Sequence, residues 1–143
     1  MAHIKVSIGT KVRAYKLIAQ SIPQAVPTKV TFPNETFDLN SEWSTVNSTF
    51  TAKEAGYYLV IYQLAYDSTA MTAPSMFVVK NNLTNICITN LTNTSLQTIG
   101  NLCDIHYLNI GDTLEFYELH LTVAKNTAIV ENEVYIAISN FKF

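Results

Sequence analysis

The apolar residues of this 143-residue chain alternate with polar ones as in β-strands, and no window sustains the spacing of a helix. β-branched and aromatic residues fill the apolar runs, and turn-forming residues separate them. Regular short strands without intervening helices predict an all-β antiparallel sandwich or barrel. The predicted strands lie at 11–22, 28–32, 46–52, 56–66, 75–80, 85–89, 95–108, 112–123 and 133–143.

The segment 56–66, GYYLVIYQLAY, is apolar on both of its faces. Strand alternation places Tyr58, Tyr62 and Tyr66 on one face, and the opposite face begins at Tyr57. If one face packs on the sandwich core, the other must be covered by something else. We interpret the second face as a subunit interface, and a covering loop of the same subunit is the alternative.

A tight turn is predicted where Gly111 and Asp112 follow the strand that ends at Leu108. Glycine tolerates a positive φ, and an aspartate side chain accepts hydrogen bonds from a turn backbone. We therefore expect a hairpin here, with the next strand starting near Thr113 and with a positive φ at Gly111.

Composition excludes several classes of protein. Hydrophobic residues make up 48% of the chain and charged residues 14%, which is too apolar for a disordered chain. No apolar run approaches the roughly 18 residues that span a bilayer, so we expect no membrane insertion. The first ten residues contain no apolar block typical of a signal peptide, which indicates a mature form or a protein that never enters the secretory route.

The charge is unevenly distributed along the chain. The first thirty residues contain five cations and no acid, whereas the remainder holds four cations and eleven acids. Residues 1–11 are predicted to form a basic arm outside the folded domain. Its cations are too sparse for a nucleic-acid partner, so docking on an acidic neighbouring subunit is the preferred interpretation.

Residues able to carry chemistry are few. Cys87 and Cys103 lie too far apart for a zinc knuckle or a redox CxxC motif, and both a buried free pair and a disulfide remain open. The four glycines build neither a dinucleotide-binding fingerprint nor a P-loop. We predict no catalytic residue, no cofactor and no enzymatic activity.

Two histidines each follow an acid at a spacing of two, which puts both side chains on one face of a strand. Asp104 with His106 is a candidate metal site or a base with its orienting carboxylate, and Glu118 with His120 is another. A simple paired or solvent-facing couple is the favoured interpretation of each. His3 lies in the N-terminal arm.

Five sequons occur, three of them between residues 81 and 95, which we expect to be an exposed loop or edge strand. They indicate either a glycan-coated surface or a genome that favours Asn and Thr codons. The five candidate glycosylation sites are Asn34, Asn47, Asn82, Asn90 and Asn93.

Several strings together resemble one known family. The strings are VRAYKLIAQSIP (12–23), TKVTF (28–32) with Phe37-Asp38, STFTAKEAGYYLVIYQLAY (48–66), VVKNN (78–82), YLNIGDTLEFY (107–117) and YIAISNFKF (135–143). In this order they resemble the globular head of the complement 1q/tumour necrosis factor-like superfamily, especially its stand-alone bacterial and phage members. No collagen-like stalk is present, so a complement function is not implied.

The resemblance covers residues 12–143 and implies a ten-stranded jelly roll that assembles as a tight homotrimer. We therefore assign a trimer interface to an aromatic set on the 56–66 strand and its flanking strands. Some members of the family bind calcium, for which the acidic trio Asp112, Glu131 and Glu133 is a weak candidate. The interface set is Tyr58, Tyr62, Tyr66, Phe116 and Phe141.

Together these observations predict a non-enzymatic, trimeric structural or recognition protein on the surface of a virus or phage particle. Its partners are other virion proteins and a host surface glycan or protein. The alternative is a secreted or spore-surface lectin-like module, and an enzyme ranks third. Recognition is expected in loops, through Asp67, Thr69, Asn82, Asn90 and Asn93.

Overall fold

The computed structural model describes residues 9–66, 71–93 and 96–141, and in these residues every regular element is a β-strand. The expectation of an all-β chain is confirmed for this part of the molecule. The strands are β1 (Lys11–Tyr15), β2 (Ser21–Ile22), β3 (Thr28–Lys29), β4 (Asn34–Asp38), β5 (Trp43–Ser44), β6 (Thr49–Thr51), β7 (Gly56–Tyr66), β8 (Ser75–Lys80), β9 (Thr84–Asn90), β10 (Thr92–Asn93), β11 (Thr98–Leu108), β12 (Thr113–Leu119), β13 (Lys125–Asn126) and β14 (Tyr135–Asn140).

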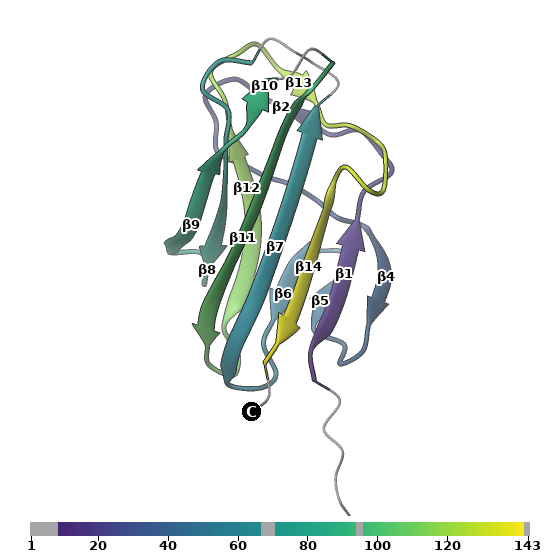
Figure 1. Ribbon diagram of the computed structural model, residues 1–143, viewed down its shortest axis with the longest axis vertical. Helices are drawn as coiled ribbons and strands as arrows, with labels where there is room; N and C mark the ends of the chain where they lie inside the picture. The colour runs from purple at the N-terminus through teal and green to yellow at the C-terminus, as the bar shows by residue number, and fades with distance from the viewer. Residues whose placement is uncertain (1–8, 67–70, 94–95, 142–143) are drawn as a thin grey trace, which may run out of the picture.

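Two antiparallel sheets pack face to face (Figure 1). The first, which we call the inner sheet, has the strand order β10-β11-β7-β14-β1-β4. The second, the outer sheet, runs β5-β6-β12-β8-β9, with β3 also paired to β12. A short two-stranded ladder joins β13 to β2. The predicted antiparallel sandwich is confirmed.

The core is organised around β7, which pairs along its whole length with β11 and over six residues with β14. Tyr58, Tyr62 and Tyr66 point from β7 into the space between the sheets and are fully buried. The Tyr62 ring meets the rings of Phe32 and Phe116 edge to face, at centroid distances of 6.0 and 5.2 Å. Such edge-to-face contacts add to the free energy gained by burying the rings.

The predicted strand boundaries hold best for two strongly apolar segments. The predictions at 56–66 and 75–80 coincide with β7 and β8. The predicted strand at 11–22 is instead broken into β1 and β2, with Leu17 and Ile18 exposed between them. The two-residue strands β5, β10 and β13 were not predicted, because two residues are too few to display an alternation.

The sandwich also begins earlier than the predicted boundary after residue 11. Lys11 is the first residue of β1 and pairs with Ser139 of β14. Thr10 is buried, and its carbonyl accepts a hydrogen bond from the Asn140 N–H at 3.3 Å. Residues 1–8 lie outside the described residues, so the basic arm remains a prediction for them alone.

The turn at Gly111 has the expected backbone but a different role. Gly111 has φ +87°, and the Asp112 N–H donates to the Asn109 carbonyl at 3.0 Å, as in a type II turn. The flanking strands do not pair with each other, because β11 belongs to the inner sheet and β12 to the outer sheet. The hairpin prediction was therefore wrong: the turn carries the chain from one sheet to the other.

Asp112 ties this turn to the neighbouring β8–β9 turn. Its carboxylate accepts hydrogen bonds from the Asn81 amide and the Asn109 N–H, both at 2.8 Å, and lies 2.7 Å from the Lys80 ammonium. The Asn81 hydrogen bond, followed by the contact with Lys80, lowers the pKa of Asp112 to about 2. The anionic carboxylate is thus stabilised by folding.

Replacing Gly111 by valine should lower the melting temperature of the protein. A Cβ at this position would meet nothing within 4 Å, so the cost comes from the positive φ alone, about 1–3 kcal/mol. Gly111→Asn should cost less, because asparagine tolerates the left-handed region. Thermal unfolding of both variants checks this, and equal melting temperatures for wild type and Gly111→Val would contradict it.

Asp112→Asn should destabilise the protein at neutral pH by up to about 2 kcal/mol. The folded-state pKa lies below the ordinary value of 3.8, so the carboxylate stabilises the fold above about pH 4 and loses this effect between about pH 4 and 2. Denaturant unfolding at a series of pH values should show that the difference in free energy of unfolding between wild type and variant closes over this range. A gap that stays constant down to pH 2 would count against the assignment.

Candidate functional site

The most distinctive surface is the outward face of the inner sheet. Alternate residues of β7 and β11 point away from the core, and register places Tyr57 opposite Tyr107 and Leu59 opposite Ile105. Tyr57, Ile105 and Tyr107 are each about half exposed, at 53%, 52% and 50%. We call Tyr57, Leu59, Ile61, Ile105 and Tyr107 the outer patch. Such a continuous apolar surface is uncommon on a soluble monomer unless it binds something.

The aromatic part of the outer patch is ordered by contacts within it. The Tyr57 and Tyr107 rings meet edge to face, with centroids 5.2 Å apart and planes at 75°. Leu59 and Ile61 are half-buried between the neighbouring strands. The rings are therefore held in place before any partner arrives, which reduces the entropy lost on binding.

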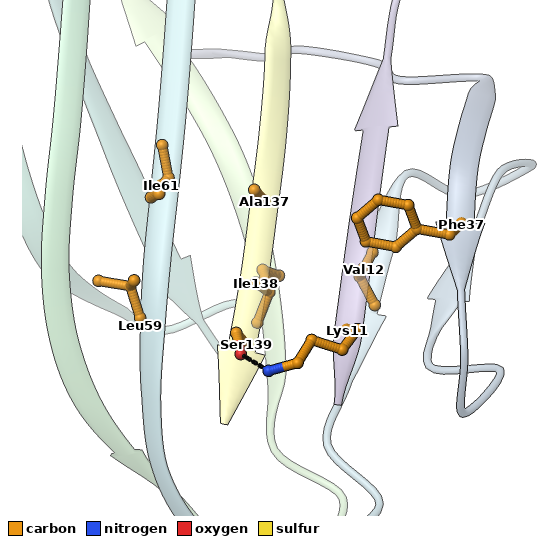
Figure 2. Close-up of a pocket in the computed structure, with 8 residues that line it drawn as sticks. All are labelled: Lys11, Val12, Phe37, Leu59, Ile61, Ala137, Ile138 and Ser139. Carbon is orange, nitrogen blue, oxygen red and sulfur yellow. Dashed lines mark hydrogen bonds between the residues drawn. The ribbon is translucent and has the colours of Figure 1, made fainter. Parts of the chain in front are cut away.

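A shallow hollow of about 110 Å³ continues the outer patch toward β1 and β4. Its residues come from β1, β4, β7 and β14. Figure 2 shows Phe37 of β4 beside β1 and the Lys11 amine donating a hydrogen bond to the Ser139 hydroxyl. The lining is mostly apolar, so an inserted side chain would gain contacts without displacing many polar groups. The lining residues are Lys11, Val12, Phe37, Leu59, Ile61, Ala137, Ile138 and Ser139.

Polar side chains border the outer patch where β14 begins. Gln63 accepts a hydrogen bond from Asn101 at 3.2 Å and donates one to the Asn132 carbonyl at 2.8 Å. Arg13 forms an ion pair with Glu131 at 2.8 Å. An apolar centre with a polar border is the arrangement of a protein–protein interface.

Four of the five residues predicted for the trimer interface do not lie on this surface. Tyr58, Tyr62, Tyr66 and Phe116 are fully buried within a single chain, so they have no surface to offer a second one. β7 is apolar on both faces, as predicted, but the face that carries Tyr58, Tyr62 and Tyr66 packs on the core of its own chain. Phe141, which is 41% exposed, remains a prediction.

The two predicted acid–histidine couples are both formed. Glu118 and His120 lie 3.0 Å apart and are completely buried, and burial is the main cause that raises the pKa of Glu118. No substrate can reach such a pair without opening the core. Asp104 and His106 lie 3.1 Å apart near the edge of the sandwich, and the Cys87 sulfur lies within 4.8 Å of donor atoms of both.

The proposed calcium trio is not brought together. Asp112 lies in the turn between β11 and β12, whereas Glu131 and Glu133 lie in the segment that precedes β14, at the other end of the sandwich (Figure 1). Asp112 is paired with Lys80, and Glu131 with Arg13. These three residues, a weak candidate from sequence, therefore do not form one calcium site, because their proximity depended on a chain path that the sequence did not reveal.

The two cysteines are free thiols. Cys87 is half-buried, whereas Cys103 is exposed on the outward face of β11, opposite Ile61. Of the two alternatives, the disulfide was wrong, and the free pair is correct except that Cys103 is not buried.

The predicted recognition residues are scattered. Asp67 and Thr69 lie outside the described residues. The stretch 81–95 was expected to be an exposed loop or edge strand, and this is confirmed for residues 81–93, where β9 lies at the edge of the outer sheet. It does not form one cluster, however, because Asn82 lies in the turn before β9 and Asn90 is the last residue of that strand.

Exposure differs among the candidate glycosylation sites. Asn47, Asn82 and Asn90 are exposed, whereas Asn34 is half-buried. The Asn93 amide donates to the Met71 carbonyl at 3.0 Å, a bond that a glycan on the same nitrogen would disturb. Glycosylation of all five sites remains a prediction.

Solved structures show which fold this geometry represents. Murine APRIL matches 93% of the chain over 99% of its own length, with a TM-score of 0.72 and 10% identity. Eiger TNF from S. frugiperda matches 94% of the chain over 93% of its own, with a TM-score of 0.70 and 11% identity. The globular domain of zebrafish complement 1qA matches 92% over 95% of its own, with a TM-score of 0.65 and 12% identity.

The chain has the tumour necrosis factor/complement 1q jelly-roll fold. Neither a protein-family model nor a curated protein matches the sequence. The described residues of this jelly roll contain no helix long and apolar enough to cross a membrane. At these identities the likeness establishes the fold, and the chemistry of the surface must supply the rest of the argument.

Proposed function

We propose that this jelly roll is a non-enzymatic module that assembles as a homotrimer through the outer patch and uses the assembly for recognition or for building a particle surface. The observation that carries the proposal is the half-exposed cluster of Tyr57, Ile105 and Tyr107 on the flat outward face of the inner sheet. A threefold arrangement is what the resemblance to the tumour necrosis factor and complement 1q domains implies.

The composition of the outer patch favours another copy of the chain as its partner. Its centre is aromatic and aliphatic, as in interfaces that form permanently, and its border carries the polar groups around Gln63 and Arg13. The hollow beside Phe37 is open and lies next to the patch, so a neighbouring subunit can place a side chain there.

Recognition is proposed for the loops rather than for the sheet faces. Loops held by a rigid sandwich are common binding sites, and three copies on one trimer raise the effective concentration of a weak contact. Exposed amide residues such as Asn82 and Asn90 suit polar ligands, including glycans. Asp67 and Thr69 stay in this proposal as sequence-based candidates.

The absence of an enzymatic role is supported by the two acid–histidine couples. Glu118 and His120 are sealed in the core. The cysteine beside the Asp104–His106 couple, Cys87, is not an activated nucleophile, because burial raises the pKa of its thiol to about 12. These contacts favour binding over catalysis.

The surface of a virus or phage particle is our proposed location. Two free cysteines, one of them exposed, suit a protein that folds in a reducing cytoplasm and is built into particles there. The alternative is a secreted or spore-surface lectin-like module, favoured by the exposed sequons at Asn47, Asn82 and Asn90. Detection of the protein, without glycans, in purified particles supports the first location, whereas a glycosylated secreted form supports the second.

Ile105→Asp should dissociate the trimer, because it places a charge at the centre of the outer patch. Ile88→Asp is the matched control: Ile88 is a similarly exposed isoleucine, 65% against 52%, on a strand of the other sheet. Analytical ultracentrifugation should find the wild type and the control at three times the 16.0 kDa of one chain, and Ile105→Asp at about one third of that mass. Far-UV circular dichroism should be the same for all three.

A monomeric wild type at micromolar concentration would overturn the trimer, and a trimer that survives Ile105→Asp would show that the outer patch is not the interface. If the trimer carries recognition, binding to a repetitive surface should also fall by about 10²–10⁴-fold in Ile105→Asp and stay unchanged in Ile88→Asp. Equal binding of monomer and trimer would remove the argument from multivalency.

A further inference from the structure

The open lateral edge of the sandwich brings together three metal-binding side chains from both sheets. β9 ends the outer sheet, and β11 borders the inner sheet on the same side of the molecule (Figure 1). β10 covers only the first two residues of β11, so the rest of that strand edge is unpaired within the described residues. We call the line where β9 faces β11 the seam.

Strand register points all three side chains into the seam. Asp104 and His106 lie opposite Val60 and Tyr58, whose side chains are buried between the sheets. Cys87 lies opposite the buried Val78 and so points inward from the other sheet. A β-bulge lies next to the Val78–Cys87 pair, since the register of β8 with β9 shifts between Val78 and Val79. Bulges re-aim side chains and are often found beside functional sites.

The donor atoms converge within the seam. The Cys87 sulfur, a carboxylate oxygen of Asp104 and an imidazole nitrogen of His106 all lie within 4.8 Å of one another. The His106 Nε2 is 3.1 Å from Asp104 Oδ2. Asp104 Oδ1 accepts a hydrogen bond from the Ile105 N–H at 2.8 Å, which orients the carboxylate.

One of these atoms lacks the partner that its burial requires. The His106 Nε2 is buried and has no hydrogen bond within the described part of the chain, although Asp104 Oδ2 is close. A buried polar atom without a hydrogen bond is costly, and such atoms in folded proteins usually have a reason. An imidazole nitrogen and a carboxylate oxygen at this separation can ligate one cation.

We propose that Cys87, Asp104 and His106 form a zinc-binding site that joins the two sheets at the seam. Thiolate, imidazole and carboxylate are the ligands that Zn²⁺ takes in proteins, and three protein ligands leave the fourth tetrahedral position for water. Zinc bonds of about 2.0–2.1 Å to nitrogen and oxygen place those two atoms about 3.3 Å apart in a tetrahedron. The 3.1 Å between His106 and Asp104 is already close to this spacing.

The Cys87 thiol must lose its proton before it can ligate a metal ion. Burial, with a contribution from the charge of Asp104, raises the pKa of Cys87 to about 12, so the thiol carries its proton when no cation is bound. Binding of Zn²⁺ would release that proton to solvent and form the zinc–thiolate bond. Each side chain comes from the same protomer, so the site does not depend on the proposed trimer.

The chain provides a matched control in its other cysteine. Cys103 precedes Asp104 on β11 but lies on the opposite face of the strand and is exposed. Cys103→Ser therefore removes a nearby thiol without touching the seam. Any metal binding that depends on exposed thiols in general would be lost in this variant.

The experiment uses the untagged full chain. Calorimetry measures the binding of Zn²⁺, and absorbance measures the binding of Co²⁺, because a thiolate–cobalt charge-transfer band reports sulfur in the coordination sphere. Wild type and Cys103→Ser should bind one ion per chain and show the band. Cys87→Ser should lose the band. Cys87→Ser and His106→Ala should each bind Zn²⁺ at least about 100-fold more weakly, since losing even a residue that only hydrogen-bonds to a ligand costs 10–100-fold in affinity.

Circular dichroism of the metal-free variants serves as the folding control. If Cys87→Ser fails to fold, Asp104→Asn and His106→Ala decide the question by the same two measurements. The proposal is overturned if the wild type shows no saturable Zn²⁺ binding, if the cobalt band survives in Cys87→Ser, or if it disappears in Cys103→Ser. A failure here would leave the trimer unaffected, because that proposal concerns the other face of β11.

Discussion

The register of β7 between β11 and β14 is the constraint on which the rest of this structure depends. Along this strand every residue is paired to a neighbour on at least one side, and successive side chains alternate between the protein's own core and its outer face. A slip of one residue would exchange Tyr62 with Ile61 and expose the buried tyrosines. The aromatic contacts of Tyr62 with Phe32 and Phe116 oppose such a slip, since they form in one register only.

This register also divides the molecule into surfaces with different chemistry. On the outward side, Tyr57 and Tyr107 are brought opposite each other and make an apolar area suited to another protein chain. On the inward side, the same strand β11 directs Asp104 and His106 toward Cys87 at the open edge of the core. One strand thus contributes alternate residues to a proposed subunit interface and to a proposed metal site.

The wrong predictions share a cause. A strand that is apolar on both faces contains no signal for which face meets the second sheet, so Tyr58 and Tyr57 were exchangeable by pattern alone. The Gly111 turn was recognised by its residues, yet the same turn serves a hairpin or a crossing between sheets. Likewise, Asp112 and Glu131 were equally good calcium ligands until the fold placed them at opposite ends of the sandwich.

By itself the sequence determined what depends on neighbours along the chain: the all-β class, the extents of β7 and β8, the positive φ of Gly111, and the pairing of each histidine with the acid two residues before it. The resemblance of its longer strings to a known family also predicted the jelly-roll fold, which the solved structures confirm. Tertiary structure alone decided which face of β7 is exposed, and it brought Cys87 to Asp104 and His106. These contacts join strands of different sheets, and their distances depend on how two sheets stack, which alternation within a single strand does not encode.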